Sequence, residues 1–189
     1  MPQWNVYEAQ LESWLAKHIS TFLYGDVLGV WRQVPCSTGI ADILALLDEH
    51  DGPRCYIIEL KRGRLRNDDL CQVLRYAQAF RAEIGSETED RLSWDDFAKA
   101  YGYPSFWDIN VSGQERIQPV LIGESAPDRV VAAAHAAHVQ VLVYDYSYRD
   151  GFSLSPTRMP RRAETHQQVA QNVARVFASA IGDDRGTTI

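Results

Sequence analysis

The sequence predicts an α/β fold, a central mixed β-sheet flanked by helices on both faces. Between residues 27 and 60, three β-type segments follow one another across short turns, which is the pattern of antiparallel strands. Between residues 118 and 146, a strand, a helix and a strand alternate, and the strands of such a βαβ unit are parallel. We therefore expect one sheet that contains both kinds of strand pair.

Length and composition indicate a single globular domain over residues 1–189. A chain of 189 residues with 46% hydrophobic and 23% charged side chains can bury about 70% of its unfolded surface. We expect an elaboration of this domain at about 86–116 and a C-terminal helix at about 165–181. The N-terminus lacks a signal-peptide pattern and the chain lacks a long apolar run, so we expect a cytoplasmic protein without membrane contact.

The net charge, the cysteines and the histidines argue against several kinds of function. A net charge of −6 argues against a protein that coats nucleic acid by bulk electrostatics. Basic side chains still cluster at residues 61–66 and 158–162, although a solvated surface is the simplest interpretation of either cluster alone. The three cysteines have no metal-binding spacing and are expected to be reduced, and the five histidines form no zinc pattern.

The first half of the chain shows one helical, three strand and one further helical segment. Apolar residues spaced by three or four predict the first helix, and Pro35 with the turn-prone residues 37–39 separates the first two strands. The third strand is a near-continuous apolar run, as expected for a central strand. These elements are expected at about 5–22, 27–33, 40–47, 55–60 and 68–84.

The second half has less regular patterning until residue 118. A short helix is expected within 94–101, followed by an aromatic-rich stretch that serves either as satellite core or as a stacking surface. Regular elements then return as a strand, a helix, a strand, an edge strand and the final helix. These are expected at about 118–122, 127–137, 139–146, 152–155 and 165–181.

Three ionisable side chains interrupt the otherwise apolar strands. Because side chains alternate along a strand, Glu59 and Lys61 share one face about 6.7 Å apart. A short antiparallel connection through Asp51 and Gly52 would place Asp42 of the preceding strand beside Glu59. Two carboxylates and one lysine are therefore expected to converge.

Two carboxylates in a partly desolvated site are unfavourable, because each ion loses hydration and their mutual repulsion raises one pKa. A divalent cation removes this conflict, and Mg²⁺ prefers a few carboxylate oxygens together with water and phosphate oxygens. A neighbouring lysine can then align the attacking water or stabilise a pentavalent phosphate. The alternative is a purely structural arrangement in which one of the acids is salt-bridged to Lys61.

The order of these residues resembles a known family. Gly39-Ile-Ala-Asp42, Ile57-Ile-Glu59-Leu-Lys61 and the helical pair Gln72 and Tyr76 resemble the PD-(D/E)XK nuclease superfamily, in particular its RecB-like branch. The chain is most similar to the nuclease domains of mismatch-cleaving and branched-DNA endonucleases. The resemblance covers residues 5 to about 84, and Ala41 stands where the superfamily usually has proline.

The resemblance implies a restriction-endonuclease-like sheet and a Mg²⁺- or Mn²⁺-dependent deoxyribonuclease that hydrolyses phosphodiester bonds with water. It implies that Asp42, Glu59 and the carbonyl of Leu60 ligate the metal and that Lys61 is the catalytic lysine. Gln72 and Tyr76, one helical turn apart, would face the same phosphate or orient the acidic residues.

Such nucleases often also use an acid of the first helix. On a helical wheel Glu8 falls between Leu15 and Ile19, within the apolar face, whereas Glu12 lies about 40° further toward solvent. A carboxylate within an apolar face needs a partner. We therefore prefer Glu8 as the metal-supporting acid and keep Glu12 as the alternative.

The basic run after the catalytic strand is expected to contact nucleic acid. Arg62, Arg64 and Arg66 follow Lys61 directly, where neighbouring phosphates of the cleaved strand would pass, and Arg75 on the next helix is a weaker candidate. DNA is the expected partner. Cleavage of RNA, and a nuclease-fold binding or regulatory subunit with little activity alone, are the alternatives. Assembly as a homodimer or within a larger repair, phage or defence complex stays open, as does the choice between endonuclease and exonuclease action.

Overall fold

The structure, a computed structural model, describes residues 3–50, 52–84, 116–147 and 151–157. The elements predicted at 94–101 and 165–181, the elaboration and the basic cluster at 158–162 lie outside these residues. The described helices are α1 (Gln3–Lys17), η1 (Ile19–Thr21), α2 (Asn67–Ile84) and α4 (Asp128–Ala136). The strands are β1 (Asp26–Cys36), β2 (Gly39–Glu49), β3 (Gly52–Leu60), β4 (Ile117–Gly123), β5 (Gln140–Ser147) and β6 (Gly151–Pro156). Within the described ranges, each helix is too short or too polar to span a lipid bilayer.

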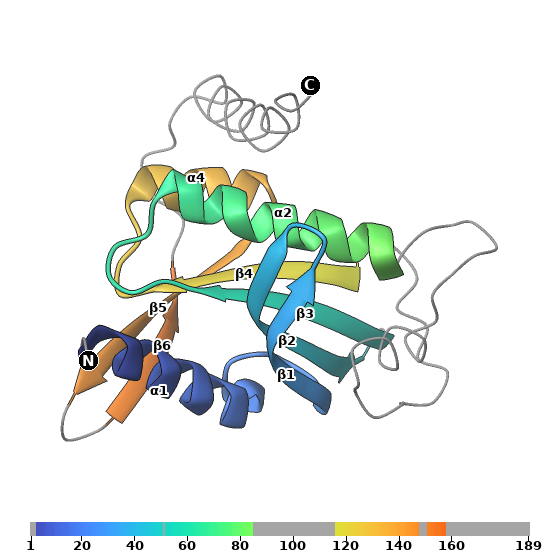
Figure 1. The fold of residues 1–189 in the computed structure, drawn as a ribbon, viewed down its shortest axis with the longest axis horizontal. Coiled ribbons are helices and arrows are strands. Elements are labelled where there is room, and N and C mark those ends of the chain that lie inside the picture. The colour runs from blue at the N-terminus through green and yellow to red at the C-terminus, as the bar shows by residue number, and fades with distance from the viewer. Residues whose placement is uncertain (1–2, 51, 85–115, 148–150, 158–189) are drawn as a thin grey trace, which may run out of the picture.

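The strands form one mixed sheet in the order β1-β2-β3-β4-β5-β6 (Figure 1). The β1/β2, β2/β3 and β5/β6 pairs are antiparallel, and the β3/β4 and β4/β5 pairs are parallel. The antiparallel half and the βαβ half therefore meet at β3, the strand that carries Glu59. This arrangement confirms the predicted mixed sheet.

Helices cover both faces of the sheet (Figure 1). On one face, α1 buries Leu11 and Leu15 against a cluster that includes Ile43 and Ile58. On the other face, α2 and α4 pack over the sheet, with residues such as Phe80 of α2 fully buried. An apolar layer on each face accounts for the almost continuous hydrophobic pattern of β3. The α/β class with helices on both faces is confirmed.

Several element boundaries differ from the predictions. β3 begins at Gly52, whereas the prediction placed a turn there and began the strand at Cys55. The first helix ends at Lys17 and a short 3₁₀ turn follows, whereas the periodicity suggested a helix to about Phe22. β1 continues through Pro35 to Cys36, whereas the prediction ended it at Gln33. A proline is tolerated there because β1 is the edge strand, so the missing N–H removes no hydrogen bond to a second neighbour.

Both strands of the β1/β2 hairpin change face midway. Trp31 and Val34 belong to the same buried cluster, as do Ala41 and Leu44, although residues three apart on a regular strand point to opposite faces. The pairs on either side of the change are Arg32 with Ile43 and Val34 with Ala41. The outer end of the hairpin consequently curves toward α2, as Figure 1 shows.

Candidate active site

Asp42 and Glu59 meet across the β2/β3 pair. In the register of this pair Ile43 lies opposite Ile58, which places Asp42 and Glu59 one residue further along their strands. The Asp42 Oδ2 atom accepts a hydrogen bond of 2.7 Å from the backbone N–H of Leu60. The predicted convergence of the two carboxylates therefore follows from the hairpin register.

Lys61 completes this group at the end of β3. Its Nζ atom donates to Glu59 Oε1 at 2.6 Å, and its backbone N–H donates to the carbonyl of Ile122 at 2.8 Å. Ile58 and Leu60 point to the opposite face, into the cluster under α1. The alternation of β3 thus sets Glu59 and Lys61 side by side, as the sequence predicted.

One oxygen of Glu59 has no hydrogen-bond partner among the described residues. The residue is only 2% exposed, and Oε2 is enclosed and unbonded while Oε1 accepts a hydrogen bond from Lys61. A buried carboxylate oxygen without a partner carries a desolvation cost. Such an atom is well suited to receive a cation.

Burial and the neighbouring charges shift the pKa values of Glu59 and Lys61. Burial, reinforced by the negative charge of Asp42, raises the pKa of Glu59 to about 7, despite the opposing effect of Lys61. Burial alone would lower the pKa of Lys61, but its hydrogen bond to Glu59 and the nearby negative charges outweigh burial and raise that pKa. Asp69, in the first turn of α2, adds to both shifts. The metal-free site is therefore short of positive charge.

Glu12 of the first helix reaches this region. The sequence placed Glu12 toward solvent, and this is wrong, because the residue is buried, at 5% exposure. Arg32 Nε donates to Glu12 Oε1 at 2.6 Å, and Gln33 Nε2 donates to Glu12 Oε2 at 2.8 Å. The side chain of Glu8 lies outside the described residues, so the preference for Glu8 stays a prediction.

Gln33 connects the helix acid to the strand acid. Its Nε2 atom also lies 3.4 Å from Asp42 Oδ1, within reach of a long hydrogen bond. Sequence reasoning missed both Arg32 and Gln33, because two polar residues on a strand are ordinary. Their role depends on the change of face of β1 between Trp31 and Val34, which the sequence pattern does not indicate.

Gln72 and Tyr76 of α2 lie together and bind each other. The Gln72 Nε2 atom donates to the Tyr76 hydroxyl at 2.8 Å. The Tyr76 ring, 6% exposed, packs against Gly39 at the tip of the hairpin, where an added Cβ atom would lie 2.9 Å from the ring. Tyr76 therefore packs under the tip of the β1/β2 hairpin. That Gln72 and Tyr76 face a phosphate or orient the acidic residues stays a prediction.

The arginine loop, residues 61–66, holds its backbone against the end of β4. Gly63 O accepts a hydrogen bond from Glu124 N at 2.9 Å, and Leu65 N donates to Ser125 O at 2.8 Å. Leu65 is buried between these anchors, at 1% exposure. Arg62, Arg64 and Arg66 are exposed, so they project from a fixed backbone next to Lys61.

Arg75 differs from these three arginines. It is half-buried on α2, and its Nε atom is enclosed without a hydrogen-bond partner among the described residues. Arg75 is therefore a weaker candidate for contact with nucleic acid than Arg62, Arg64 and Arg66, as the sequence suggested.

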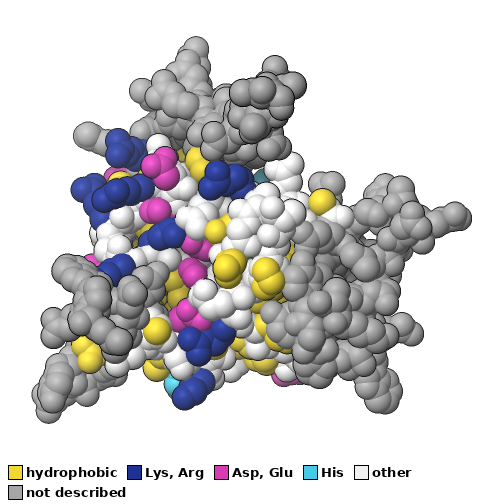
Figure 2. Space-filling view, in the orientation of Figure 1, with side chains coloured by type: hydrophobic (Ala, Val, Ile, Leu, Met, Phe, Trp, Pro, Cys, Tyr) yellow, Lys and Arg dark blue, Asp and Glu magenta, His cyan; other side chains and the backbone are white. Residues whose placement is uncertain are grey.

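Figure 2 shows that acidic side chains gather in the middle of one face of the molecule with basic side chains on either side.

The residues present fit a divalent cation with few protein ligands. No group of three or more His, Cys, Asp and Glu within the described ranges is arranged to hold a metal. Asp42 and the unbonded oxygen of Glu59 supply two oxygen donors. Mg²⁺ and Mn²⁺ suit carboxylate and carbonyl oxygens, and Mg²⁺ keeps several water ligands. An ion held by two carboxylates, a backbone carbonyl and water therefore matches this donor set.

Comparisons with known proteins yield distant structural likenesses. No family model and no curated protein matches the chain. A repair endonuclease from Pyrococcus abyssi is 15% identical, with a TM-score of 0.47, over 71% of this chain and 45% of that chain. EndoMS in its apo form is 16% identical, with a TM-score of 0.44, over 71% and 44%. EndoMS in a complex with dsDNA is 15% identical, with a TM-score of 0.40, over 82% and 46%. This chain spans less than half of each of these proteins, and likenesses at this level assign no activity.

Proposed function

We propose that this protein is a metal-dependent nuclease that hydrolyses phosphodiester bonds of DNA at a site formed by Asp42, Glu59 and Lys61. The observation that carries the proposal is the buried carboxylate of Glu59. It is paired with a lysine at one oxygen, unbonded at the other, and placed next to a second acid. A structural ion pair would not need the second acid, which raises the pKa of Glu59 further.

In this proposal Asp42, Glu59 and the carbonyl of Leu60 hold a Mg²⁺ or Mn²⁺ ion. The ion, when bound, would polarise a phosphate oxygen and lower the pKa of a bound water. Lys61 stays protonated, since its pKa is raised, and would hold the attacking water or the developing charge on phosphate. Its backbone anchor to Ile122 limits how far this ammonium group can move.

DNA as the substrate follows from the motif resemblance, and the exposed arginine loop supports a polyanionic ligand. Arg62, Arg64 and Arg66 are exposed and follow Lys61 in the loop after β3, so positive charge continues from the site along this loop. The alternatives that the test must exclude are an enzyme that cleaves RNA and a binding or regulatory subunit with little activity alone.

The test uses two substitutions with matched controls at the far end of the same hairpin. Glu59→Gln and Lys61→Met remove one charge each from the site. The controls Glu49→Gln and Arg54→Met break the other acid–base pair of β2 and β3, which is joined at 2.8 Å. Purified proteins are incubated with linear, nicked, branched and single-stranded DNA and with RNA, in Mg²⁺, Mn²⁺ or chelator.

We expect wild type and both controls to cut DNA only with metal, and Glu59→Gln and Lys61→Met to be slower by at least about 10²-fold. Far-ultraviolet circular dichroism and urea unfolding show whether the variants are folded. DNA cleavage by folded Lys61→Met at the wild-type rate would refute the assigned site. Cleavage of RNA alone would correct the substrate.

A further inference from the structure

Gln33 has an unusual backbone for a residue inside a strand. Its φ angle is +52°, in the left-handed region that only glycine adopts without cost. The other non-glycine residue with positive φ in the described ranges is His138, which follows the end of α4 rather than lying in a strand. Strained backbones of this kind persist where surrounding interactions hold them, and they gather at functional sites.

The left-handed backbone explains how two consecutive side chains reach one carboxylate. On a regular strand Arg32 and Gln33 would point to opposite faces. Here Arg32 binds Glu12 Oε1 at 2.6 Å and Gln33 binds Glu12 Oε2 at 2.8 Å. The change of face between Trp31 and Val34 occurs at the same two residues. The strain is therefore coupled to the contacts with Glu12.

The same amide group also touches the second strand. Gln33 Nε2 lies 3.4 Å from Asp42 Oδ1, and the other oxygen of Asp42 accepts the N–H of Leu60 at 2.7 Å. An amide has two N–H donors, so it can bind two carboxylates without neutralising either. Asp42 is thus restrained at both oxygens, by β3 on one side and by Gln33 on the other.

We propose that Gln33 is a positioning residue that fixes the carboxylate of Asp42 by bridging it to the buried Glu12. This inference rests on the proposed function, since it assigns Asp42 a cation to bind. Glu12, held by Arg32, is the immobile end of the bridge, and the left-handed backbone of Gln33 lets its amide reach both acids. Without the amide, Asp42 Oδ1 loses the contact that ties it to Glu12, and the carboxylate is held less firmly beside Glu59.

The test separates the amide from the backbone. Gln33→Gly removes the amide and relieves the strain, and His138→Gly relieves a similar strain at φ +55° outside the site. Gln33→Asn is a second variant, because Asn tolerates the left-handed region while its amide is one methylene too short to bridge both acids. Calorimetry gives the Kd for Mn²⁺, and urea unfolding without metal gives the equilibrium constant of unfolding.

We expect Gln33→Gly and Gln33→Asn to raise the Mn²⁺ Kd by about 10-fold or more, the usual effect of losing an outer-shell partner. The unfolding constant of Gln33→Gly should stay within about threefold of that of wild type, and His138→Gly should bind Mn²⁺ normally. A wild-type Kd in folded Gln33→Gly would overturn the inference.

A metal-free experiment distinguishes this inference from the proposed function. A double-mutant cycle combines Gln33→Ala with Asp42→Asn. We expect the change in the unfolding constant of the double variant to differ by at least about threefold from the product of the changes in the two single variants. If wild type binds no Mn²⁺, the proposed function fails, and the cycle alone then decides whether Gln33 positions Asp42. Simple additivity in the cycle would overturn the bridge.

Discussion

Glu59 makes the stability of the metal-free protein depend on pH. Its pKa is raised from 4.5 to about 7, so between these values the folded state binds a proton that the unfolded state has lost. The free energy of unfolding should therefore fall as pH rises from 4.5 to about 7. The contribution of this group is about 3 kcal/mol, at 1.36 kcal/mol per pKa unit.

The measurement compares wild type with Glu59→Gln, which cannot ionise. Urea unfolding in chelator at pH 5, 6, 7 and 8 should show the variant gaining stability relative to wild type as pH rises. Glu49→Gln, at the other end of β2 and paired with Arg54, is the matched control. Curves for Glu59→Gln and wild type that stay parallel across this range would show that Glu59 does not hold the proton.

Individual site residues were predictable where strand geometry alone decided them. Glu59 and Lys61 share a face because alternation along a strand is regular, and Asp42 follows from the hairpin register. Glu12 was misplaced because a helical wheel shows only the apolar side of one helix and not the residues of other elements that pack against it. Its burial depends on Arg32 and Gln33 of a different element. Nothing in a glutamine side chain signals a left-handed backbone.

At the scale of elements, the curved β1/β2 hairpin is stabilised by its contact with α2. Gly39 has φ +148°, and a Cβ atom there would lie 2.9 Å from the Tyr76 ring. Tyr76 is buried, so its ring cannot easily move away. We expect Gly39→Ala to lower the free energy of unfolding by about 1–3 kcal/mol, from overpacking and backbone strain together.

The control for Gly39→Ala is Gly63→Ala. Gly63 also has positive φ, +81°, but no atom lies within 4 Å of a Cβ added there. Both variants carry the backbone cost, so the difference between them in urea unfolding reports the Tyr76 contact. Equal losses of stability would mean that the hairpin tip is not pressed against α2. In the proposed nuclease, a further loss of cleavage in Gly39→Ala alone would link this contact to the position of Asp42.

Elements were predicted well where packing is regular and less well at their ends. β3 was recognised because both of its faces are covered, which leaves an apolar run. The end of β1 was misplaced because Pro35 usually stops a strand, and its tolerance depends on the edge position, which is a property of the whole sheet.

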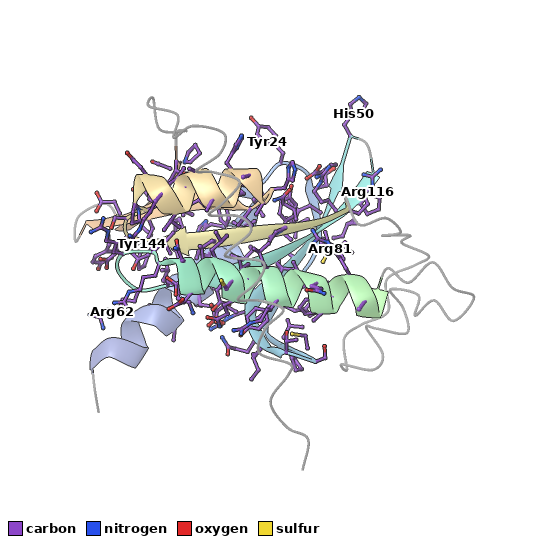
Figure 3. All side chains as sticks on the ribbon, turned by 90° about the horizontal axis from the view of Figure 1, so that it is seen from above. Tyr24, His50, Arg62, Arg81, Arg116 and Tyr144 are labelled. Atoms are coloured by element: carbon purple, nitrogen blue, oxygen red, sulfur yellow. The ribbon has the colours of Figure 1, made fainter. Side chains whose placement is uncertain are left out.

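At the scale of the whole molecule, a chain with a net charge of −6 can bind a polyanion, as proposed, only through a local basic surface. Figure 3 shows Arg62 at the opposite end of the sheet from His50 and Arg116, so the arginine loop lies away from these two basic side chains. Its fixed backbone and three exposed arginines make it the expected phosphate contact.

We therefore expect replacement of Arg62, Arg64 and Arg66 by Ala to weaken DNA binding and to make it less sensitive to salt. Each lost phosphate contact should reduce the slope of log K against log salt by about 1. Binding is measured by fluorescence anisotropy on a labelled duplex in Ca²⁺, between low and moderate salt. The control is Arg54→Ala at the far end of the sheet, and an unchanged slope in the triple variant would exclude the loop as the contact.

The pairing of β3 with β4 also implies an order of folding. β1, β2 and β3 join through short turns, whereas β4 reaches β3 only after α2 and residues 85–116 have been passed. Short loops close before long ones, so Asp42 meets Glu59 before Ile122 can anchor Lys61. We expect Glu59 to be hydrated and charged at that stage and to become enclosed when β4 pairs with β3. Near neutral pH, the docking of β4 should therefore take up a proton from solvent, and the refolding rate should rise as the medium is acidified toward pH 6.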